Sequence, residues 1–542
     1  MSENTAGAIA KRDWGETFRS FIHPRVITML FLGFSAGVPI LLIFSSLSLW
    51  LREAGVEKSA VTFFSWAALG YSFKFVWAPL VDKLPLPLLT RWLGRRRGWL
   101  LLSQFAVITA ILWMALTDPA LSEVSLTMMA LATVLLGFSS ATQDIVIDAY
   151  RIESAASDLQ ALMSSTYIAG YRIGMIVAGA GALYLAQYFG SEKDSYNYVA
   201  WMTTYAIMAA VMLVGVITTL LIPEPAEYRP AEFAYTPGDY ARFLLLFLLA
   251  VLGFIAVFFL SSKSAAALLG FNVLYESVQS ARSSLAEMFA NKNLAGLLVE
   301  TLRLGLALCV AWLVAKALMA ARVVNATMVK EAYLNPVRDF FQRYGTGIAI
   351  ILLLLVGFYR VSDIVLGVIA NVFYQDMGYT KTQIASVAKV FGLLMTIAGG
   401  FAGGLLAVRF GVIRILFLGA VLSAVTNLLF VWLSNSEADI TRLYVVIGAD
   451  NLSAGLASAA FIAYLSSLTN ISFTAVQYAI FSSLMTLFPK VLGGYSGTFV
   501  ESMGYSNFFI MTTLLTLPVL VLIVIAGRYV KDEVKFNAPG SA

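Results

Sequence analysis

The chain has 542 residues, of which 60% are hydrophobic and only 12% are charged, a balance that cannot cover a water-facing surface. Its mean hydropathy of +0.82 places most of the chain in lipid, and at roughly 35 to 40 residues for a span with its loop, about fourteen membrane spans fit. The single histidine, His23, and the single cysteine, Cys309, exclude a histidine-based metal site or triad, a thiolate metal cluster and an intrachain disulfide, so no metal and no cofactor are expected.

Six apolar stretches long enough to span a bilayer come first. They run from residues 25 to 50, 62 to 81, 99 to 116, 125 to 147, 163 to 189 and 199 to 222. The next segment, 223–239, is rich in proline and acidic residues, which is typical of a linker. Two more spans follow, 242–260 and 294–319, and the stretch between them has apolar residues at helical spacing, which favours a helix on the membrane surface.

Six further spans run from residues 345 to 374, 384 to 408, 412 to 433, 443 to 468, 476 to 500 and 508 to 526. The order of six, two and six predicts an all-α polytopic membrane protein. We expect five parts: an amino-terminal segment 1–24, a six-helix bundle 25–225, a linker with two inserted transmembrane helices and a surface amphipathic segment 226–343, a second six-helix bundle 344–530, and a tail 531–542. No cleavable signal peptide is expected, because the first apolar run is too long.

Lysine and arginine predict the orientation, because positively charged loops resist translocation. Lys11, Arg12 and Arg19 precede the first span, whereas the charged residues of the loop 115–123 are all acidic. Both termini are therefore expected in the cytoplasm. The net charge of +5 is spread over loops, so it indicates membrane orientation, and no binding to nucleic acid is expected.

An internal repeat links the two predicted bundles. Four positions match, each pair being offset by 318 residues: Ser164 with Ser482, Ser165 with Ser483, Arg172 with Lys490, and Gly179 with Gly497. The chain is therefore interpreted as two copies of one bundle.

The loop after the second span supports the repeat. It reads Ala78-Pro79-Leu80-Val81-Asp82-Lys83 and reaches Gly94-Arg95-Arg96-Arg97, which resembles the signature loop of major facilitator transporters. A degenerate second copy of this motif runs from Gly404 to Gly411, with Val408 at the position of the acidic residue. The resemblance implies the major facilitator fold, with two six-helix bundles around a cavity that opens alternately to each side.

A latch is expected at the cytoplasmic end of the bundles, because Asp82 at a helix end can pair with nearby arginines and hold one state. Asp148 lies at the same end of the fourth span. The expected members of this latch are Asp82, Arg95, Arg96, Asp148 and Arg151. The alternative is an ordinary basic cytoplasmic loop.

Charged residues inside the spans cost roughly 2.5 to 3.5 kcal/mol each, so they normally face a cavity or a partner. Cations and hydrogen-bonding groups in such a cavity suit a carboxylate or phosphate cargo. The candidates for cargo binding are Lys74, Gln143, Tyr171, Arg172, Tyr359, Arg360, Lys389 and Asn451. The candidates for proton coupling are Asp144, Asp363 and Asp450. The alternative is a set of structural ion pairs, such as Asp144 with Lys74 or Arg172, and Asp363 with Arg360 or Lys389.

Several runs together resemble the AmpG muropeptide permeases, which belong to the peptide and acetyl-coenzyme A transporter branch of the major facilitators. These are residues 33–39, the run Lys74-Phe75-Val76-Trp77-Ala78-Pro79-Leu80-Val81-Asp82, residues 94–100, Ala141 to Ala149, and Gly170-Tyr171-Arg172-Ile173-Gly174-Met175. The second half is similar but looser, and the two inserted helices depart from the general pattern.

The resemblance implies a proton-coupled importer of GlcNAc-1,6-anhydro-MurNAc peptides in the bacterial inner membrane, which serves peptidoglycan recycling and β-lactamase induction. Its expected partners are the muropeptide, protons and the lipid bilayer, and a monomer is expected. One alternative is a relative that moves another anionic conjugate, such as acetyl-coenzyme A. The other is a membrane enzyme or sensor, which is disfavoured because the spans hold no histidine and both tails are short.

Overall fold

The computed structural model describes residues 22–56, 69–155, 159–191, 195–225, 235–261, 273–289, 292–493 and 495–533. Within these ranges the regular elements are all helices, and 13 helical stretches are long and apolar enough to cross a membrane. Each overlaps one of the spans expected from the sequence. The remaining expected span, 62–81, begins outside the described residues. The prediction of an all-helical polytopic protein is therefore confirmed.

The chain forms two compact units, one of residues 1–228 and 338–542 and the other of residues 229–337. The first unit has two halves, before and after the second unit in the sequence. Its first half contains α2 (Pro24–Leu41), η2 (Leu42–Ser46), α3 (Leu47–Glu53), α5 (Leu69–Phe73), η4 (Lys74–Val76), α6 (Ala78–Lys83), α7 (Leu89–Leu93), α8 (Arg95–Ala115), α9 (Glu123–Ser154), α10 (Gln160–Ile176), η5 (Val177–Gly181), α11 (Ala182–Tyr188), α12 (Tyr198–Val211) and α13 (Leu213–Leu221).

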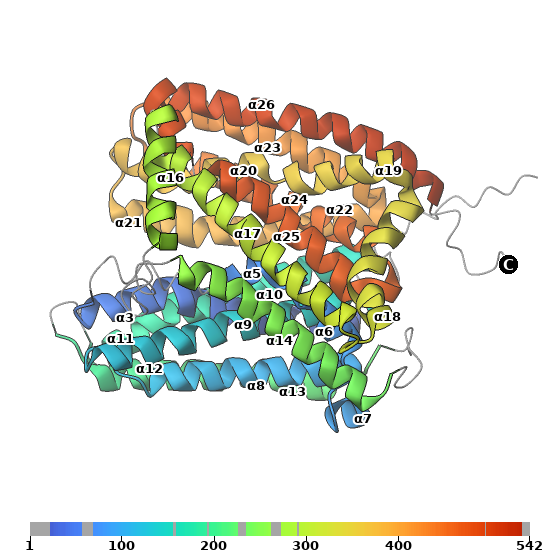
Figure 1. Cartoon of the computed structure of the whole chain (residues 1–542). Coiled ribbons are helices and arrows are strands. Elements are labelled where there is room, and N and C mark those ends of the chain that lie inside the picture. The colour runs from blue at the N-terminus through green and yellow to red at the C-terminus, as the bar shows by residue number, and fades with distance from the viewer. Residues whose placement is uncertain are drawn as a thin grey trace, which may run out of the picture. The chain divides into compact units, whose positions relative to one another are not determined.

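The second half of the first unit begins within α19, which is kinked at Gly345. It contains α19 (Asn335–Phe358), α20 (Val361–Asp376), α21 (Lys381–Ile384), η7 (Ala385–Phe391), α22 (Gly392–Phe410), α23 (Val412–Ser434), α24 (Ile440–Leu468), η8 (Ile471–Phe473), α25 (Thr474–Gly493) and α26 (Ser496–Glu533). Figure 1 shows the blue and cyan helices of the first half and the orange and red helices of the second half running in the same general direction.

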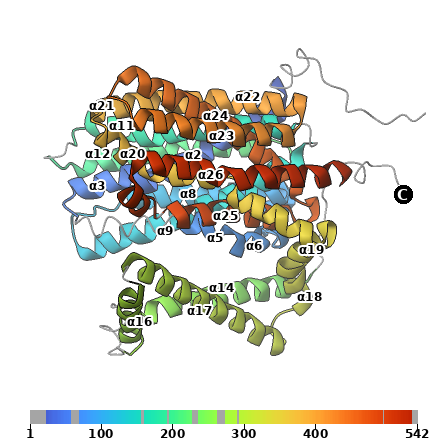
Figure 2. The same ribbon diagram turned by 90° about the horizontal axis from the view of Figure 1, so that it is seen from above.

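The second unit consists of α14 (Pro237–Leu260), α16 (Val273–Phe289), α17 (Lys292–Ala320), α18 (Ala326–Val329) and η6 (Lys330–Leu334). A capping box between Thr236 and Asp239 starts α14, because each side chain satisfies a backbone N–H that the first turn leaves free. Helices α14 and α17 pack side by side, and α16 is turned across them (Figure 2). The stretch expected to be amphipathic is thus a helix.

Polar residues start the long helices of the first unit. Ser122 accepts a hydrogen bond from the Ser125 N–H at the start of α9, and Asp439 accepts one from the Thr441 N–H at the start of α24. Such N-caps satisfy helix donors that have no partner in the first turn. They end the connecting loops at defined residues and so fix where each span begins.

Glycines let neighbouring helices approach at backbone distance. On α2 and α10, a Cβ at Gly37 would collide with the Tyr171 carbonyl, and a Cβ at Gly170 would collide with the Leu30 carbonyl. Small residues at such crossings allow close packing of transmembrane helices. This packing sets the position of Tyr171 and Arg172 on α10.

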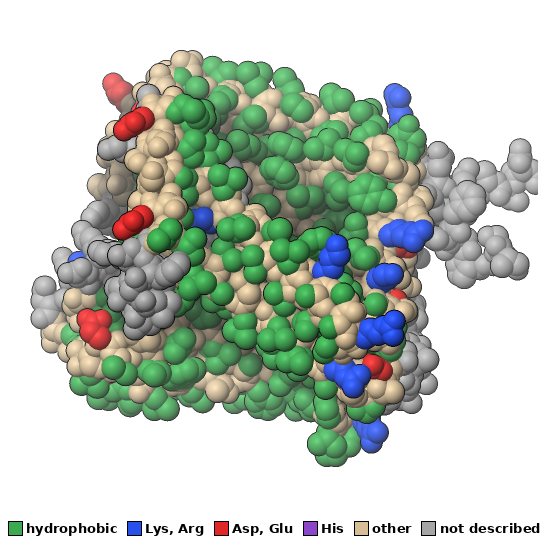
Figure 3. Space-filling view, in the orientation of Figure 1, with side chains coloured by type: hydrophobic (Ala, Val, Ile, Leu, Met, Phe, Trp, Pro, Cys, Tyr) green, Lys and Arg blue, Asp and Glu red, His purple; other side chains and the backbone are tan. Residues whose placement is uncertain are grey.

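The two halves of the first unit touch at one end. A buried apolar cluster of the second half takes in Ile152 and Ala161 from the first half, and Gly404 of α22 faces Ser165 of α10. Helix α25 packs against α5, η4, α6 and α9. We call this the latch end, because the residues of the expected latch lie there. On the face in Figure 3, hydrophobic side chains predominate over charged ones, as expected of a surface that meets lipid.

Candidate functional site

Arg96 is the centre of the first polar group at the latch end, and only 1% of it is exposed. Its Nη2 donates to Asp82 Oδ1 at 2.8 Å and to Glu153 Oε1 at 2.5 Å, and its Nε donates to Glu153 Oε2 at 2.9 Å. Charge-assisted bonds of this kind are the strongest hydrogen bonds in proteins. A buried arginine of α8 therefore joins the end of α6 to the end of α9.

Both carboxylates of this group also reach the second half. Asp82 Oδ2 accepts the backbone N–H of Val476 at 3.1 Å, and Glu153 Oε1 accepts the Thr474 hydroxyl at 2.8 Å. Both partners lie in the first turn of α25, where free N–H groups and the helix dipole favour an anion. We call these five residues the Arg96 cluster. It fastens the first half to the start of a second-half helix.

Arg95 and Glu224 support the Arg96 cluster. Arg95 Nη1 donates to the Asp82 carbonyl at 2.8 Å, and its Nη2 lies 3.6 Å from Glu153 Oε1. Glu224 accepts the backbone N–H groups of Arg96 at 2.7 Å and Arg97 at 3.0 Å. Burial raises the pKa of the Glu224 carboxyl above its ordinary value, although these two bonds partly lower it. Glu224 therefore caps α8.

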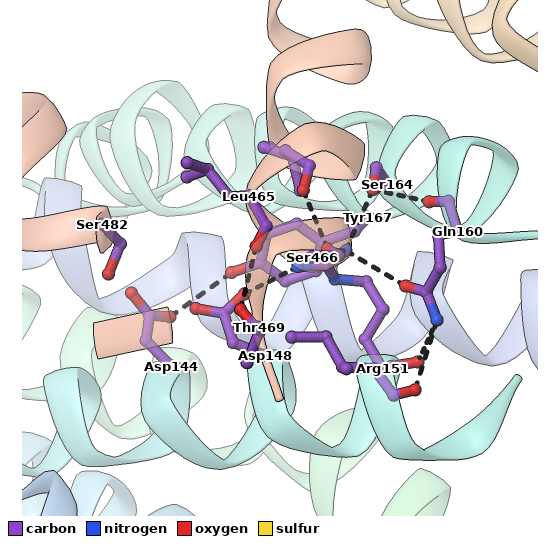
Figure 4. Close-up of polar contacts among 12 residues, drawn as sticks. Asp144, Asp148, Arg151, Gln160, Ser164, Tyr167, Leu465, Ser466, Thr469 and Ser482 are labelled. Atoms are coloured by element: carbon purple, nitrogen blue, oxygen red, sulfur yellow. Dashed lines mark hydrogen bonds and ion pairs between the residues drawn. The ribbon is translucent and has the colours of Figure 1, made fainter. Parts of the chain in front are cut away.

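A second polar group surrounds Arg151, which is fully buried (Figure 4). Its Nη1 donates to Ser466 Oγ at 2.7 Å, to Ser164 Oγ at 3.1 Å and to Gln160 Oε1 at 3.4 Å. Its Nη2 lies 3.5 Å from Asp148 Oδ1. We call these five residues the Arg151 cluster. Since Ser466 belongs to α24, this arginine also joins the two halves.

Tyr478 completes the surroundings of Arg151. The guanidinium carbon lies 5.2 Å from the centre of the Tyr478 ring, which comes from α25. A cation over an aromatic face is stabilised when both are shielded from water. Arg151 is thus held by two helices of the second half.

Lys74 and Asp144 lie next to the Arg151 cluster, to which Asp148 belongs. Lys74 Nζ is 3.4 Å from Asp148 Oδ2, and both side chains are buried. Asp144 accepts the Tyr167 hydroxyl at 3.4 Å and is close enough to Lys74 for their charges to interact. Both carboxylates therefore face one lysine, as their four-residue spacing indicates.

The second half carries a matching polar group around Arg360. Its Nε lies 3.3 Å from Asp363 Oδ2, and its Nη1 donates to Ser458 Oγ at 2.6 Å. Asp363 also accepts the Ser423 hydroxyl. Of the pairs considered as a structural alternative, Arg360 with Asp363 is present, whereas Lys74 is paired with Asp148.

Asp450 and Asn451 lie beside this group on α24. Asp450 accepts the Thr426 hydroxyl at 3.2 Å and interacts electrostatically with Asp363 and Arg360. Asn451 Oδ1 accepts the Thr396 hydroxyl at 3.0 Å. The structure therefore brings Asp363, Asp450 and Arg360 together.

Arg172 differs from the other arginines at the site. Among the described residues no carboxylate lies within ion-pair distance of it, and its guanidinium meets only Met175 Sδ, at 3.8 Å. It is close enough to Arg360, in the other half, for the two positive charges to interact. Lys490 of α25 is similar, because its Nζ donates to Ser72 Oγ of α5 at 3.3 Å and no described carboxylate pairs with it.

The remaining candidates have different surroundings. Gln143 is buried, its Oε1 accepts the Ser35 hydroxyl at 3.4 Å, and its Nε2 has no partner in the described part of the chain. Tyr359 donates to the Leu416 carbonyl at 3.0 Å and stacks on Phe461, so its visible contacts belong to the packing of the second half. The Lys389 side chain lies outside the described residues.

Sequence reasoning did not select Glu153, Glu224, Ser466 or Tyr478 for the site. Glu153 resembled an ordinary charge at a helix end, and Glu224 stood in a Pro-Glu-Pro segment interpreted as linker. The available signal for Glu153 was its place at the same end of the helix as Asp148 and Arg151. Ser466 and Tyr478 had no sequence signal.

Comparison with known proteins places these features in a family. A protein of Rickettsia felis described as putative transporter AmpG 4 is 30% identical over 506 residues, which cover 93% of this chain and 97% of that protein. The chain belongs to the AmpG family. Another AmpG relative, the anhydromuropeptide permease of Escherichia coli K12, is 27% identical over 511 residues, covering 94% of this chain and 81% of the permease.

The family model that matches, over residues 25–231, is described as acetyl-coenzyme A transporter 1. Among solved structures, the proton:xylose symporter XylE superposes with a TM-score of 0.57 at 12% identity, covering 96% of this chain and 97% of XylE. FucP superposes with a TM-score of 0.54 at 12% identity, covering 94% and 99%. The chain therefore has the major facilitator fold, and it is a multi-pass membrane transporter whose relatives named here are also transporters.

Proposed function

We propose that this AmpG-family transporter imports GlcNAc-1,6-anhydro-MurNAc peptides from the periplasm to the cytoplasm of a bacterium, and that the proton gradient drives the import. The observation that carries the proposal is the pair of cations, Arg172 and Lys490, for which the described residues supply no carboxylate. A cation within a span is costly unless an anion or water compensates it. A cargo that carries carboxylates would compensate both.

The chemistry of the cargo fits the rest of the site. A disaccharide with a peptide stem offers carboxylates, an amine and many hydroxyl groups. The site offers the guanidinium of Arg172, the free amide nitrogen of Gln143 and the hydroxyl of Tyr171. Cationic and neutral donors together select an anion that is also a sugar. The cations Lys74 and Arg360 would join in when cargo displaces their present partners.

The latch would close the cytoplasmic side of the cavity. The Arg96 and Arg151 clusters join the halves at the end that carries the basic run Arg95-Arg96-Arg97, and basic loops stay in the cytoplasm. Both termini are then cytoplasmic, and the state described here is closed to the cytoplasm. Import requires both clusters to separate.

Protons would enter through the carboxylates that lie among the cargo cations. Asp144 sits beside Lys74, and Asp450 sits beside Asp363 and Arg360. When cargo takes a cation, the adjacent carboxylate loses its compensating charge and binds a proton more readily. Asp144, Asp363 and Asp450 are therefore the proposed coupling residues.

Uptake into inverted and right-side-out membrane vesicles tests the proposal. Labelled anhydromuropeptide should accumulate only when the proton gradient points in the direction of import, and an uncoupler should abolish accumulation. Equal uptake with and without the transporter would refute a muropeptide cargo. Accumulation that survives the uncoupler would refute proton coupling alone. In the cell, the proposed place of this activity is the inner membrane, in peptidoglycan recycling and β-lactamase induction.

A second cargo class follows from the family match. The matching family model is described as an acetyl-coenzyme A transporter, and phosphates suit the same cations. Competition in the uptake assay separates the two cargoes. Acetyl-coenzyme A should not reduce muropeptide uptake if the muropeptide proposal holds, and it should be accumulated itself if the alternative holds.

A further inference from the structure

Asp148 contacts two cations, one in the expected cargo site and one in the latch. Its Oδ2 lies 3.4 Å from Lys74 Nζ, and its Oδ1 lies 3.5 Å from Arg151 Nη2. Lys74 belongs to η4, in the expected cargo site, whereas Arg151 grips Ser466 of the second half at 2.7 Å. An unbroken line of buried polar atoms therefore runs from the cargo site to the latch.

The two contacts of Asp148 are long, and the contact of Arg151 with Ser466 is short. Charge-assisted N–H to carboxylate bonds usually measure about 2.7 to 2.9 Å, so neither cation is held by Asp148 in the best geometry. A buried carboxylate gains most from a close, well-aligned partner. Asp148 would therefore move closer to one cation if the other were taken away.

Helix geometry defines where such a movement would go. Asp148 and Arg151 are three residues apart on α9 and share a face. Arg151 can turn toward Asp148 by changing its rotamer, without a backbone shift. That turn takes its guanidinium away from Ser466, the hydroxyl that it contacts on the second half.

We infer that Lys74, Asp148, Arg151 and Ser466 form a relay by which cargo unlatches the Arg151 cluster, an inference that rests on the proposed anionic cargo. A cargo carboxylate draws Lys74 from Asp148. Asp148 then draws Arg151 from Ser466, and the hydrogen bond from Arg151 to the second half is lost. Cargo binding thereby favours opening of the end that was closed.

The Arg96 cluster is not part of this relay. Its carboxylates, Asp82 and Glu153, are bonded to Arg96 and to the first turn of α25 at 2.5 to 3.1 Å. These contacts are short, so the cluster supplies a constant hold. The relay thus makes one cluster responsive to cargo, while the other sets the bias that cargo must overcome.

The test uses the full-length chain with Cys309 replaced by serine and two spin labels at the latch end. The labels replace Trp92 of α7, which is 78% exposed, and Ser472 of η8, which is also exposed. Pulsed electron-spin measurements give the distance between the halves with and without GlcNAc-anhydroMurNAc tripeptide. Binding of the same tripeptide is measured separately, so that occupancy and opening are known independently.

In the unsubstituted background, saturating tripeptide should raise the long-distance population about fivefold or more, the lower end of couplings between linked sites. Asp148→Asn should still bind tripeptide, because Lys74 has lost a competitor for the anion, but its long-distance population should not rise with cargo. The matched control is Asp118→Asn. Asp118 accepts the Tyr196 hydroxyl away from the latch, and this variant should open like the unsubstituted protein.

Full cargo-dependent opening in Asp148→Asn would overturn the relay, and so would loss of tripeptide binding in that variant. Ser466→Ala is the second arm, in case Asp148→Asn fails to fold. It removes only the far end of the relay and should raise the long-distance population without cargo. An unchanged population in Ser466→Ala would also overturn the relay. If the unsubstituted protein does not bind tripeptide, the proposed cargo fails, and the Ser466→Ala arm still decides the relay.

Discussion

The latch end and the middle of the first unit differ in how their charged side chains are compensated. At the latch end, Arg96 bonds two carboxylates of its own half, and those carboxylates also bond residues of the second half. In the middle, Arg172 and Lys490 have no carboxylate partner among the described residues. In the first arrangement, which we call complete, each charge has a counter-charge within the described chain. In the second, which we call incomplete, the proposed function assigns that compensation to an anion supplied from outside.

The largest effect should follow from breaking the complete arrangement. Arg96→Ala leaves Asp82 buried without its cation and leaves Glu153 only the longer contact with Arg95, which should reduce stability by about 3 to 5 kcal/mol. Thermal unfolding in detergent would measure the loss. A double variant with Asp82→Asn should recover part of it, because one uncompensated charge is removed. Unchanged stability in Arg96→Ala would contradict the complete arrangement.

The next effect should come from the incomplete arrangement. Arg172→Ala should weaken cargo binding by about 2 kcal/mol or more, roughly thirtyfold, and should leave the stability of the protein unchanged or improved. Direct binding measurements and thermal unfolding would test this result, in which affinity falls and stability does not, in contrast to the loss of stability expected for Arg96→Ala. Arg442→Ala is the control, since Arg442 pairs with Asp439 at the start of α24, outside the site. Normal binding in Arg172→Ala would remove Arg172 from the cargo site.

Asp144 extends the comparison, because it is a carboxylate that lies among the cations of the proposed cargo site. Asp144→Asn should reduce gradient-driven accumulation about fivefold or more while exchange of cargo without a gradient continues. Vesicle uptake with and without an uncoupler separates the two. Asp376→Asn, which alters an acceptor of the Tyr505 hydroxyl elsewhere in the second half, is the control. Unaltered sensitivity of Asp144→Asn to the uncoupler would exclude Asp144 from coupling.

The effect of changing the support of the latch should be smaller than that of Arg96→Ala. Gly94 has φ +89° and ψ 173°, a region that only glycine adopts freely, and a Cβ there would collide with the Glu224 carboxylate. Gly94→Ala should therefore cost about 1 to 3 kcal/mol, measured by thermal unfolding. Gly55→Ala also stands at positive φ but has open space around its Cβ, so it should cost less. Equal losses in the two variants would show that the contact with Glu224 contributes nothing.

The sequence predicted the complete arrangement better than the incomplete one. Asp82 and Arg96 stand in a loop with a recognisable signature, and their pairing is present. Their partners in the second half, Thr474 and the Val476 N–H, had no signature, because a hydroxyl and a main-chain amide occur everywhere in a helical protein. The long-range contacts of the latch required the folded chain.

The proposed cargo site was predictable in its cations but not in their pairing. Hydropathy alone indicated that Lys74, Arg172 and Arg360 lie within spans. Which of them has a partner depends on where helices cross, and Asp148 rather than Asp144 is the nearer partner of Lys74. Tyr359 shows the same limit, since a tyrosine next to an arginine can face the core, and here it stacks on Phe461.

The bond from Asp82 to residue 476 has an evolutionary consequence. Its donor is a main-chain amide, so every amino acid except proline can supply it. A substitution at position 476 would therefore keep the hydrogen bond. A substitution of Asp82 would remove it, because the acceptor is the side-chain carboxylate. Relatives that retain this bond should therefore vary widely at position 476, keep aspartate at position 82, and avoid proline at position 476.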